Sequence, residues 1–172
     1  VNTTVPGALV LVTNGVYAGG LNITIPLTLR SINGSQFSVI NGGGTNQCVF
    51  YLAGGASLTG FTLTNGFDNI GGGGGGLYGG STNAFLTNCI IAGNSARYGG
   101  GVESCTFYNC TLTGNAGGGA TGGILYNCTV TSNSGNGADS CTLYNCTLSG
   151  NSGAGASACT LYGCALSANA GP

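Results

Sequence analysis

The chain has 172 residues, 37 of them glycine, and its five charged side chains give a net charge of −1. So weak a charge provides no electrostatic attraction for nucleic acid or for an anionic membrane. The chain also lacks histidine and lysine, which are common proton-transfer groups in enzymes. The apolar fraction of 42%, with Val, Ile, Leu and Phe at regular spacings, predicts one folded domain.

The first 70 residues contain short strand-like runs separated by Gly, Asn and Pro, which predict irregular coils. These runs are residues 9–17, 22–31, 37–42, 48–52 and 57–66. Residues 71–82 are rich in glycine, and we expect them to form a loop or wide turn outside the core. No apolar run reaches about 18 residues, so no membrane insertion is expected.

Residues 83–172 are dominated by an internal repeat with a step of 18 residues. The step places equivalent residues in columns along the chain, and short apolar–polar alternation within each unit predicts β-strands. Stacked coils bring the members of a column about 4.8 Å apart. The columns are Cys110, Cys128, Cys146 and Cys164; Cys105, Cys141 and Cys159, with Gly123 in the gap; Asn109, Asn127 and Asn145; Asn115, Asn133 and Asn151; and Tyr108, Tyr126, Tyr144 and Tyr162.

The period also separates types of repeat protein. Eighteen residues are too few for a helix–turn–helix repeat, but they suit one coil of short strands joined by tight turns. In residues 141–149, the pattern predicts that Cys141 and Leu143 face inward and that Thr142 and Tyr144 face outward. The Asn109, Asn127 and Asn145 column begins three Asn-Cys-Thr sequences; we expect its side chains to face inward, which makes them weak glycosylation candidates.

Residues 99–115 (GGGVESCTFYNCTLTGN) and 117–133 (GGGATGGILYNCTVTSN) combine a glycine turn, a short strand, an Asn, and a strand ending near Asn. This pattern resembles the right-handed parallel β-helix of the pectate-lyase-like superfamily, and in particular polymorphic outer-membrane and autotransporter-type surface proteins. The resemblance implies an all-β, right-handed parallel β-helix of about eight coils. It also implies a location outside the cell or at its surface. It says little about activity, because this fold carries many functions.

The cysteines suggest three interpretations. Buried thiols packed against the leucine columns are favoured, and disulfides between neighbouring coils are the second. A metal site comes third, because a column places its thiols along an axis instead of around one point. We expect no cofactor.

The outward columns leave further alternatives open. The tyrosines form a possible glycan-binding strip, a self-assembly contact, or an ordinary outer strand face. Pairs of Thr, such as Thr111 with Thr113 and Thr129 with Thr131, resemble the flat face of ice-binding solenoids. Glu103 and Asp139 fall in one column about 10 Å apart, a separation that overlaps that of an inverting carboxylate pair, but no base supports a site.

These observations favour a non-catalytic extracellular structural solenoid, either a segment of a surface protein or a subunit of a head-to-tail filament. No polar cap is evident at either end of the sequence, and uncovered strand edges favour stacking of copies. The alternatives are a polysaccharide-binding or polysaccharide-cleaving module and an ice-binding solenoid.

Overall fold

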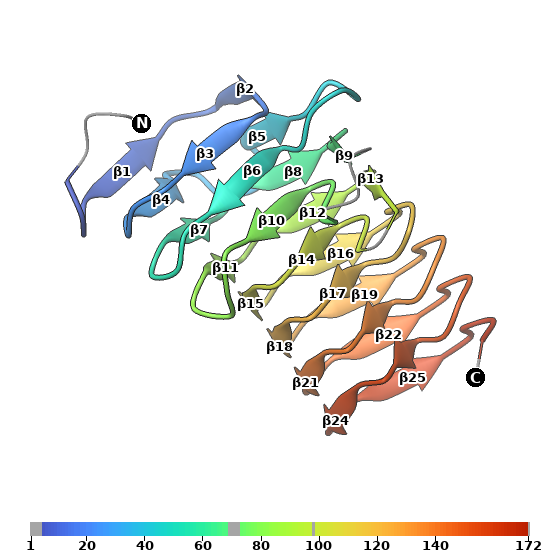
Figure 1. The fold of residues 1–172 in the computed structure, drawn as a ribbon. Helices are drawn as coiled ribbons and strands as arrows, with labels where there is room; N and C mark the ends of the chain where they lie inside the picture. Colours follow the sequence, from blue (N-terminus) through green and yellow to red (C-terminus); the bar gives the residue numbers. More distant parts are fainter. Residues whose placement is uncertain (1–4, 69–72, 98, 172) are drawn as a thin grey trace.

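The computed structural model describes residues 5–68, 73–97 and 99–171, which form a stack of parallel strands without a helix (Figure 1). The chain winds from one end of the stack to the other, and each turn adds a strand to each of two or three sheets. The fold class predicted from the repeat is therefore confirmed: the protein is an all-β parallel β-solenoid of about seven turns. The expected number of coils, about eight, is close to this value.

Three long sheets form the sides of the solenoid. Sheet 1 contains β1 (Leu9–Val12), β4 (Thr28–Ser31), β7 (Ser57–Thr59), β11 (Phe85–Thr87), β15 (Thr106–Tyr108), β18 (Ile124–Tyr126), β21 (Thr142–Tyr144) and β24 (Thr160–Tyr162). Sheet 2 contains β2 (Gly15–Ala18), β5 (Ser38–Asn41), β8 (Thr62–Thr64), β12 (Ile90–Ala92), β16 (Thr111–Thr113), β19 (Thr129–Thr131), β22 (Thr147–Ser149) and β25 (Ala165–Ser167). Sheet 3 contains β3 (Leu21–Ile23), β6 (Val49–Leu52), β10 (Leu77–Gly79), β14 (Val102–Glu103), β17 (Ala120–Thr121), β20 (Ala138–Asp139) and β23 (Ala156–Ser157).

The core is built from inward-facing strand residues and from buried residues of the turns between strands, such as Phe61 and Cys110. In sheet 1 the pairing places Phe107, Leu125 and Leu143 over one another, and all three side chains are fully buried. Burying a side chain of this kind contributes about 1.5–3 kcal/mol relative to leaving it exposed. Because each coil has only a few such residues, the continuous core depends on the stacking of neighbouring coils.

The glycine-rich segment differs from the prediction of a loop outside the core. Residues 71 and 72 lie outside the described part of the chain, but Gly73–Gly76 are buried and strand β10 follows them directly. A Cβ atom on Gly76 would lie 2.6 Å from the carbonyl oxygen of Gly101, whereas its N–H donates to that oxygen over 2.8 Å. Glycine is needed here because the backbones of neighbouring coils approach too closely for any side chain.

The coil after Asn94 contains the three extra residues expected from the 21-residue step to Asn115. A two-stranded sheet of β9 (Phe67–Asp68) and β13 (Ser95–Ala96) occupies this region. From Gly101 onward the coils again have the regular 18-residue spacing. A Cβ atom on Gly101 would meet the carbonyl oxygen of Gly119 in the next coil. Within the described ranges, no helix of the length and apolarity needed to span a bilayer is found.

Candidate functional site

The two asparagine columns have opposite environments. Asn109, Asn127 and Asn145 are exposed and lie at the turn between sheets 1 and 2, with positive φ angles of 53–54°. The expectation that they face inward is therefore wrong. Asparagine tolerates the left-handed conformation that this tight turn requires, and at such a corner the Cα–Cβ bond points away from the core.

The second column forms a buried amide ladder from Asn94 to Asn169. At Asn133, the side-chain oxygen accepts the backbone N–H and the side-chain amide of Asn115, both over 3.0 Å. Its own amide donates to the carbonyl of Leu112 over 3.2 Å and to the side-chain oxygen of Asn151 over 2.9 Å. Each asparagine thus bonds to the coil before it and to the coil after it, and its polar groups are fully used inside the solenoid.

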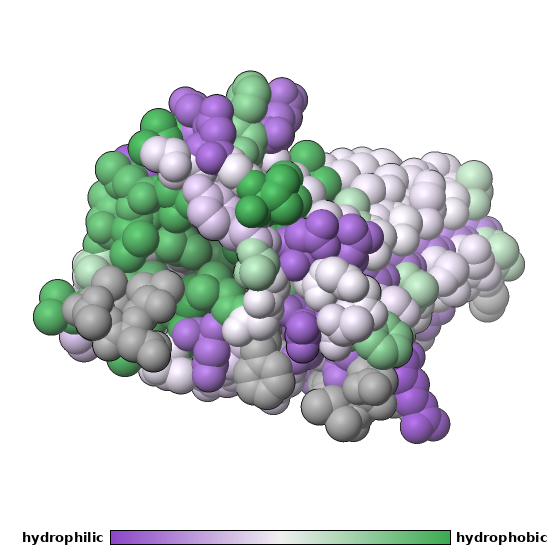
Figure 2. All heavy atoms as spheres, turned by 90° about the horizontal axis from the view of Figure 1, so that it is seen from above, coloured by the Kyte–Doolittle hydropathy of each residue, from purple (hydrophilic) through white to green (hydrophobic). Residues whose placement is uncertain are grey.

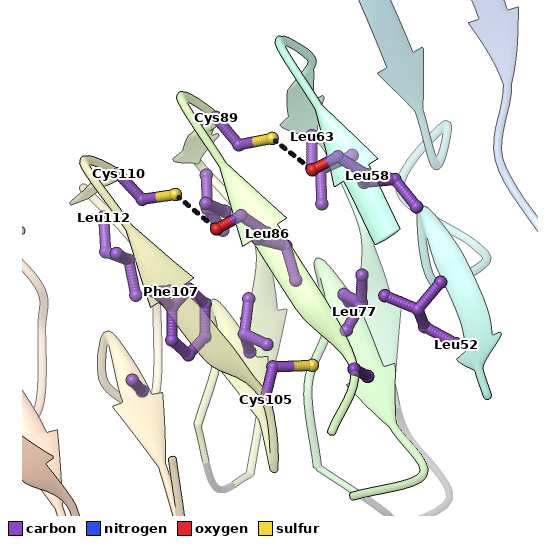
Figure 3. Close-up of a cluster of buried hydrophobic side chains, with 14 of the residues drawn as sticks. Leu52, Leu58, Leu63, Leu77, Leu86, Cys89, Cys105, Phe107, Cys110 and Leu112 are labelled. Carbon is purple, nitrogen blue, oxygen red and sulfur yellow. Dashed lines mark hydrogen bonds between the residues drawn. The ribbon is translucent and has the colours of Figure 1, made fainter. Parts of the chain in front are cut away.

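The main cysteine column runs along the turn between sheets 1 and 2. The sulfur atoms of Cys110, Cys128, Cys146 and Cys164 lie 3.3–3.5 Å from the carbonyl oxygen of the tyrosine two residues earlier. Those of Cys110, Cys146 and Cys164 also lie 3.5 Å from a leucine carbonyl in the preceding coil. Figure 3 shows Cys89 and Cys110 turned the same way, toward the carbonyls of Leu58 and Leu86. The thiols therefore adopt one repeated conformation along this column.

The thiols in this column influence one another. Hydrogen bonds from Cys110 and Cys146 lower the pKa of Cys128, whereas the pKa values of Cys110 and Cys146 are raised by the bond to Cys128. One thiol is thus the preferred site of ionisation at the expense of its neighbours. All nine cysteines are free, and only Cys159 and Cys164 are partly exposed.

The second cysteine column has a gap that another residue compensates. The backbone N–H of Cys141 donates to the sulfur of Cys159 over 3.3 Å. Between Cys105 and Cys141 the column contains Gly123, where a Cβ atom would lie 3.1 Å from the ring of Phe107. Phe107 stands where the neighbouring coils have leucine, so its larger ring fills the space that Gly123 leaves. In the described part of the chain, no three Cys, Asp or Glu side chains converge as a metal site would require.

The tyrosine column forms a continuous stack of rings. Tyr108, Tyr126, Tyr144 and Tyr162 have successive centroid distances of 5.0, 4.8 and 4.7 Å, with interplanar angles of 6–8°. Neighbouring rings cover each other's faces, so the column presents mainly ring edges and hydroxyl groups to solvent. Stacking of sugars requires free ring faces, and this stack leaves few of them.

The threonine pairs lie on sheet 2 in exact register. Thr111, Thr129 and Thr147 are partners in adjacent strands, and Thr129 and Thr147 are exposed. The structure adds a pair that the irregular spacing hid, because Thr62 and Thr64 fall in the same two columns. The array is interrupted by β12 (Ile90–Ala92) between these pairs and ends in Ala165 and Ser167.

The acidic residues are arranged as the sequence predicted, with one addition. Glu103 pairs with Thr121, which pairs with Asp139, so the two acids lie two coils apart on sheet 3. A hollow of about 290 Å³ beside Asp139 is also lined by Gly117, Gly118, Thr121 and Asn136, among others, and Glu103 does not line it. Burial and the nearby charge of Asp68 raise the pKa of Glu103. The proximity of Asp68 to Glu103 was not visible in the sequence, because Asp68 lies before the irregular coil.

The two ends of the solenoid expose apolar side chains. Figure 2 shows apolar residues gathered at the end formed by the first strands, where Leu9, Leu11 and Val16 are exposed. A hollow of about 220 Å³ opens there between Val10, Val12, Tyr17, Leu29 and other apolar residues. At the opposite end Leu161 and Leu166, which occupy core columns, remain 40% and 45% exposed. Each end thus presents an incomplete hydrophobic layer.

No protein-family model, no curated protein and no solved structure matches this chain. The class of the protein therefore rests on the repeat and on the fold: it is a parallel β-solenoid whose columns of Asn, Cys, Leu and Tyr run along its axis.

Proposed function

We propose that this protein is a non-catalytic structural solenoid that acts as a rigid rod outside the cell or at its surface. The observation that carries the proposal is the asparagine ladder. Its buried side-chain amides form their hydrogen bonds with the neighbouring coils and are not directed into a pocket. The tyrosine rings likewise contact the rings of the neighbouring coils, since they stack face to face. Ordered columns of this kind favour stiffness along the axis over chemistry at one point. The location is proposed from the resemblance of the glycine-turn and Asn-strand pattern to surface solenoids.

Copies of the chain are proposed to associate end to end. Leu161 and Leu166 at one end, and Leu9 and the hollow beside it at the other, are apolar surfaces that stacking would bury. The edge strands at both ends also carry backbone groups that a further parallel strand can pair with. A contact between two different ends does not close on itself, so it produces rods of increasing length.

Sedimentation velocity over a range of concentrations, together with electron microscopy, tests this assembly. The expected result is rods that lengthen with concentration. Leu166→Arg should abolish them, because it places a charge in the end face, whereas the control Thr147→Arg on the exposed side of sheet 2 should not. Monodisperse monomers at high concentration would contradict end-to-end association.

A second candidate function is ice binding through sheet 2. The observation that favours it is the in-register array of threonines, in which Thr129 and Thr147 are exposed and aligned with Thr111. Thermal hysteresis of the purified protein is the direct measurement. A clear positive signal that is lost in Thr129→Lys but kept in Thr121→Lys, on sheet 3, would favour ice binding over a purely structural role.

A polysaccharide-cleaving role is the remaining alternative, with Glu103 and Asp139 as its carboxylates. It is the less supported proposal, because Thr121 lies between these residues and neither histidine nor lysine is available. Assays on pectin-like and other acidic glycans should detect no cleavage. Cleavage that disappears in both Glu103→Gln and Asp139→Asn would overturn the non-catalytic proposal.

A further inference from the structure

Two cysteines differ from the other seven in burial. Cys141 and Cys146 are only 3% and 1% exposed. Cys159 and Cys164 occupy the same two columns one coil later, and both are partly exposed. The coil that contains the second pair covers the first, whereas no described coil covers the second pair (Figure 1). Because the equivalent thiols of the inner coils are buried, the additional exposure is toward the open end formed by β24 and β25.

The backbone at these two positions also has unused hydrogen-bonding capacity toward that end. In the inner coil, the carbonyl oxygens of Cys141 and Cys146 each accept an N–H group from the next coil over 2.9 Å. A further parallel coil would bond to the carbonyls of Cys159 and Cys164 in the same way. The two partly exposed thiols therefore lie in the surface that end-to-end stacking would cover.

The strand pairing identifies the coil of a second copy that continues this ladder. Following the paired residues from strand to strand places Leu9 of β1 in the column that ends at Thr160. In the same way, Val16 of β2 falls in the column that ends at Ala165. The residue before each of Leu9 and Val16 bonds to the second coil, so their own N–H groups point to the open edge, since direction alternates along a parallel strand. In this register they lie opposite the carbonyls of the two partly exposed cysteines.

We propose that Cys159 and Cys164 are modification sites that control end-to-end association: a group attached to either thiol blocks stacking, and stacking protects both thiols. This inference rests on the proposed association of copies and adds the chemistry that regulates it. Both side chains pack against the core, so an attached group has to project beyond the open end. Stacked coils are only about 4.8 Å apart, which leaves no room there for a bulky substituent.

The modifying reagent is a low-molecular-weight disulfide such as glutathione disulfide. A cysteine thiolate attacks one sulfur of the reagent, a mixed disulfide forms, and the other half leaves as a thiolate that takes up a proton. The number of disulfide bonds is unchanged, so no other oxidant is needed. Hydrogen bonding from Cys141 lowers the pKa of Cys159 from 9.0 to about 7, which raises its thiolate fraction at neutral pH. The seven buried cysteines are shielded from the reagent by the packed coils.

Sedimentation velocity before and after reaction with glutathione disulfide tests the block. The reduced protein should form rods that lengthen with concentration. Peptide mass spectrometry should find glutathione on Cys159 and Cys164 and on no buried cysteine. The modified protein should sediment as monomers, and reduction with dithiothreitol should restore the rods. The double variant Cys159→Ala/Cys164→Ala should form rods that the reagent does not affect.

The converse effect is measured on the unmodified chain, which avoids any effect of a substitution on folding. With excess iodoacetamide, the alkylation rates of Cys159 and Cys164 should fall as the protein concentration is raised, in proportion to the fraction of ends that are stacked. In Leu166→Arg, which places a charge in the end face, both rates should stay constant over the same range.

Two outcomes would overturn this regulation and leave end-to-end association intact. They are rods formed by the fully glutathionylated protein, and alkylation rates that stay constant while rods form. Loss of rods when the double variant is treated with the reagent would also overturn it, because the sensitivity would then belong to other cysteines. Monomers of the reduced wild-type protein at every concentration would instead contradict end-to-end association itself, and this regulation with it.

Discussion

Replacing Asn133 by alanine removes one member of the buried amide ladder. The substitution deletes four hydrogen bonds, two accepted from Asn115 and two donated to Leu112 and Asn151. The side-chain oxygen of Asn151 keeps a partner, because the backbone N–H of residue 133 still donates to it over 3.1 Å. Two groups are left without partners, the N–H and one amide proton of Asn115, whereas the carbonyl of Leu112 still faces the N–H of Thr131 in the parallel ladder between β16 and β19.

The expected cost follows from these two groups. An unsatisfied buried polar group costs about 1–3 kcal/mol, so the loss of unfolding free energy should be at least about 2 kcal/mol. Native domains are stable by only about 5–15 kcal/mol, and the variant should therefore unfold at a much lower urea concentration. Urea unfolding followed by far-ultraviolet circular dichroism measures the change, and hydrogen exchange should show lost protection in the adjacent coils.

The matched control is Asn127→Gly, which changes the same residue type six positions earlier. Asn127 is exposed with a φ of 53°, and Gly163 occupies the same column with a φ of 62°. Glycine adopts this conformation without strain, so the change should stay within about 1 kcal/mol. Equal effects of the two substitutions, or a cost below about 1 kcal/mol for Asn133→Ala, would refute the ladder as a source of stability.

Three further predictions concern the cysteine columns. Gly123→Cys should destabilise the protein by about 1–3 kcal/mol, because its side chain would overlap the ring of Phe107 and the carbonyl of Cys105. Phe107→Leu in the same chain should recover part of that loss in a double-mutant cycle. Additive effects of the two substitutions would show that the ring of Phe107 does not fill the space left by Gly123. Hydrogen bonding from Cys141 lowers the pKa of Cys159 from 9.0 to about 7, so its alkylation rate should reach half its maximum near pH 7, as read by peptide mass spectrometry, and a midpoint near pH 9 would refute this. Burial raises the pKa of Cys48 from 9.0 to about 11. Because the thiol ionises first in the unfolded chain, the unfolding free energy should be unaffected by this group below pH 9 and should fall by about 1.4 kcal/mol per pH unit between pH 9 and 11. Cys48→Ala should reduce that slope, as measured by urea unfolding at several pH values.

Several features were predictable because they depend on periodicity alone. The 18-residue step places Leu125 over Phe107 and Leu143 over Leu125, as the strand pairing has them. Alternation within residues 141–149 predicted that Cys141 and Leu143 are buried and that Thr142 and Tyr144 are less so, and the structure agrees. Glu103 and Asp139 likewise lie two coils apart with Thr121 between them.

Other features depend on contacts between coils of unequal length. The steps between coils are irregular before Asn94, so the sequence could not show that Asp68 approaches Glu103, or that Thr62 continues the threonine array. The segment containing Gly73–Gly76 looked too flexible for the core, yet close packing of neighbouring backbones requires glycine there. Composition alone does not distinguish a flexible glycine from one that permits close contact.

The sequence by itself determined that this protein is a parallel β-solenoid and which residues share a column, because an 18-residue step leaves room only for short strands and tight turns. Only the tertiary structure decided which of the two asparagine columns faces inward. Asn109 and Asn115 recur with the same period, but the first lies at a left-handed turn that directs its side chain to solvent, whereas the second lies where its amide meets those of the adjacent coils. The direction of a side chain depends on local backbone conformation, and a repeat period carries no information about that conformation.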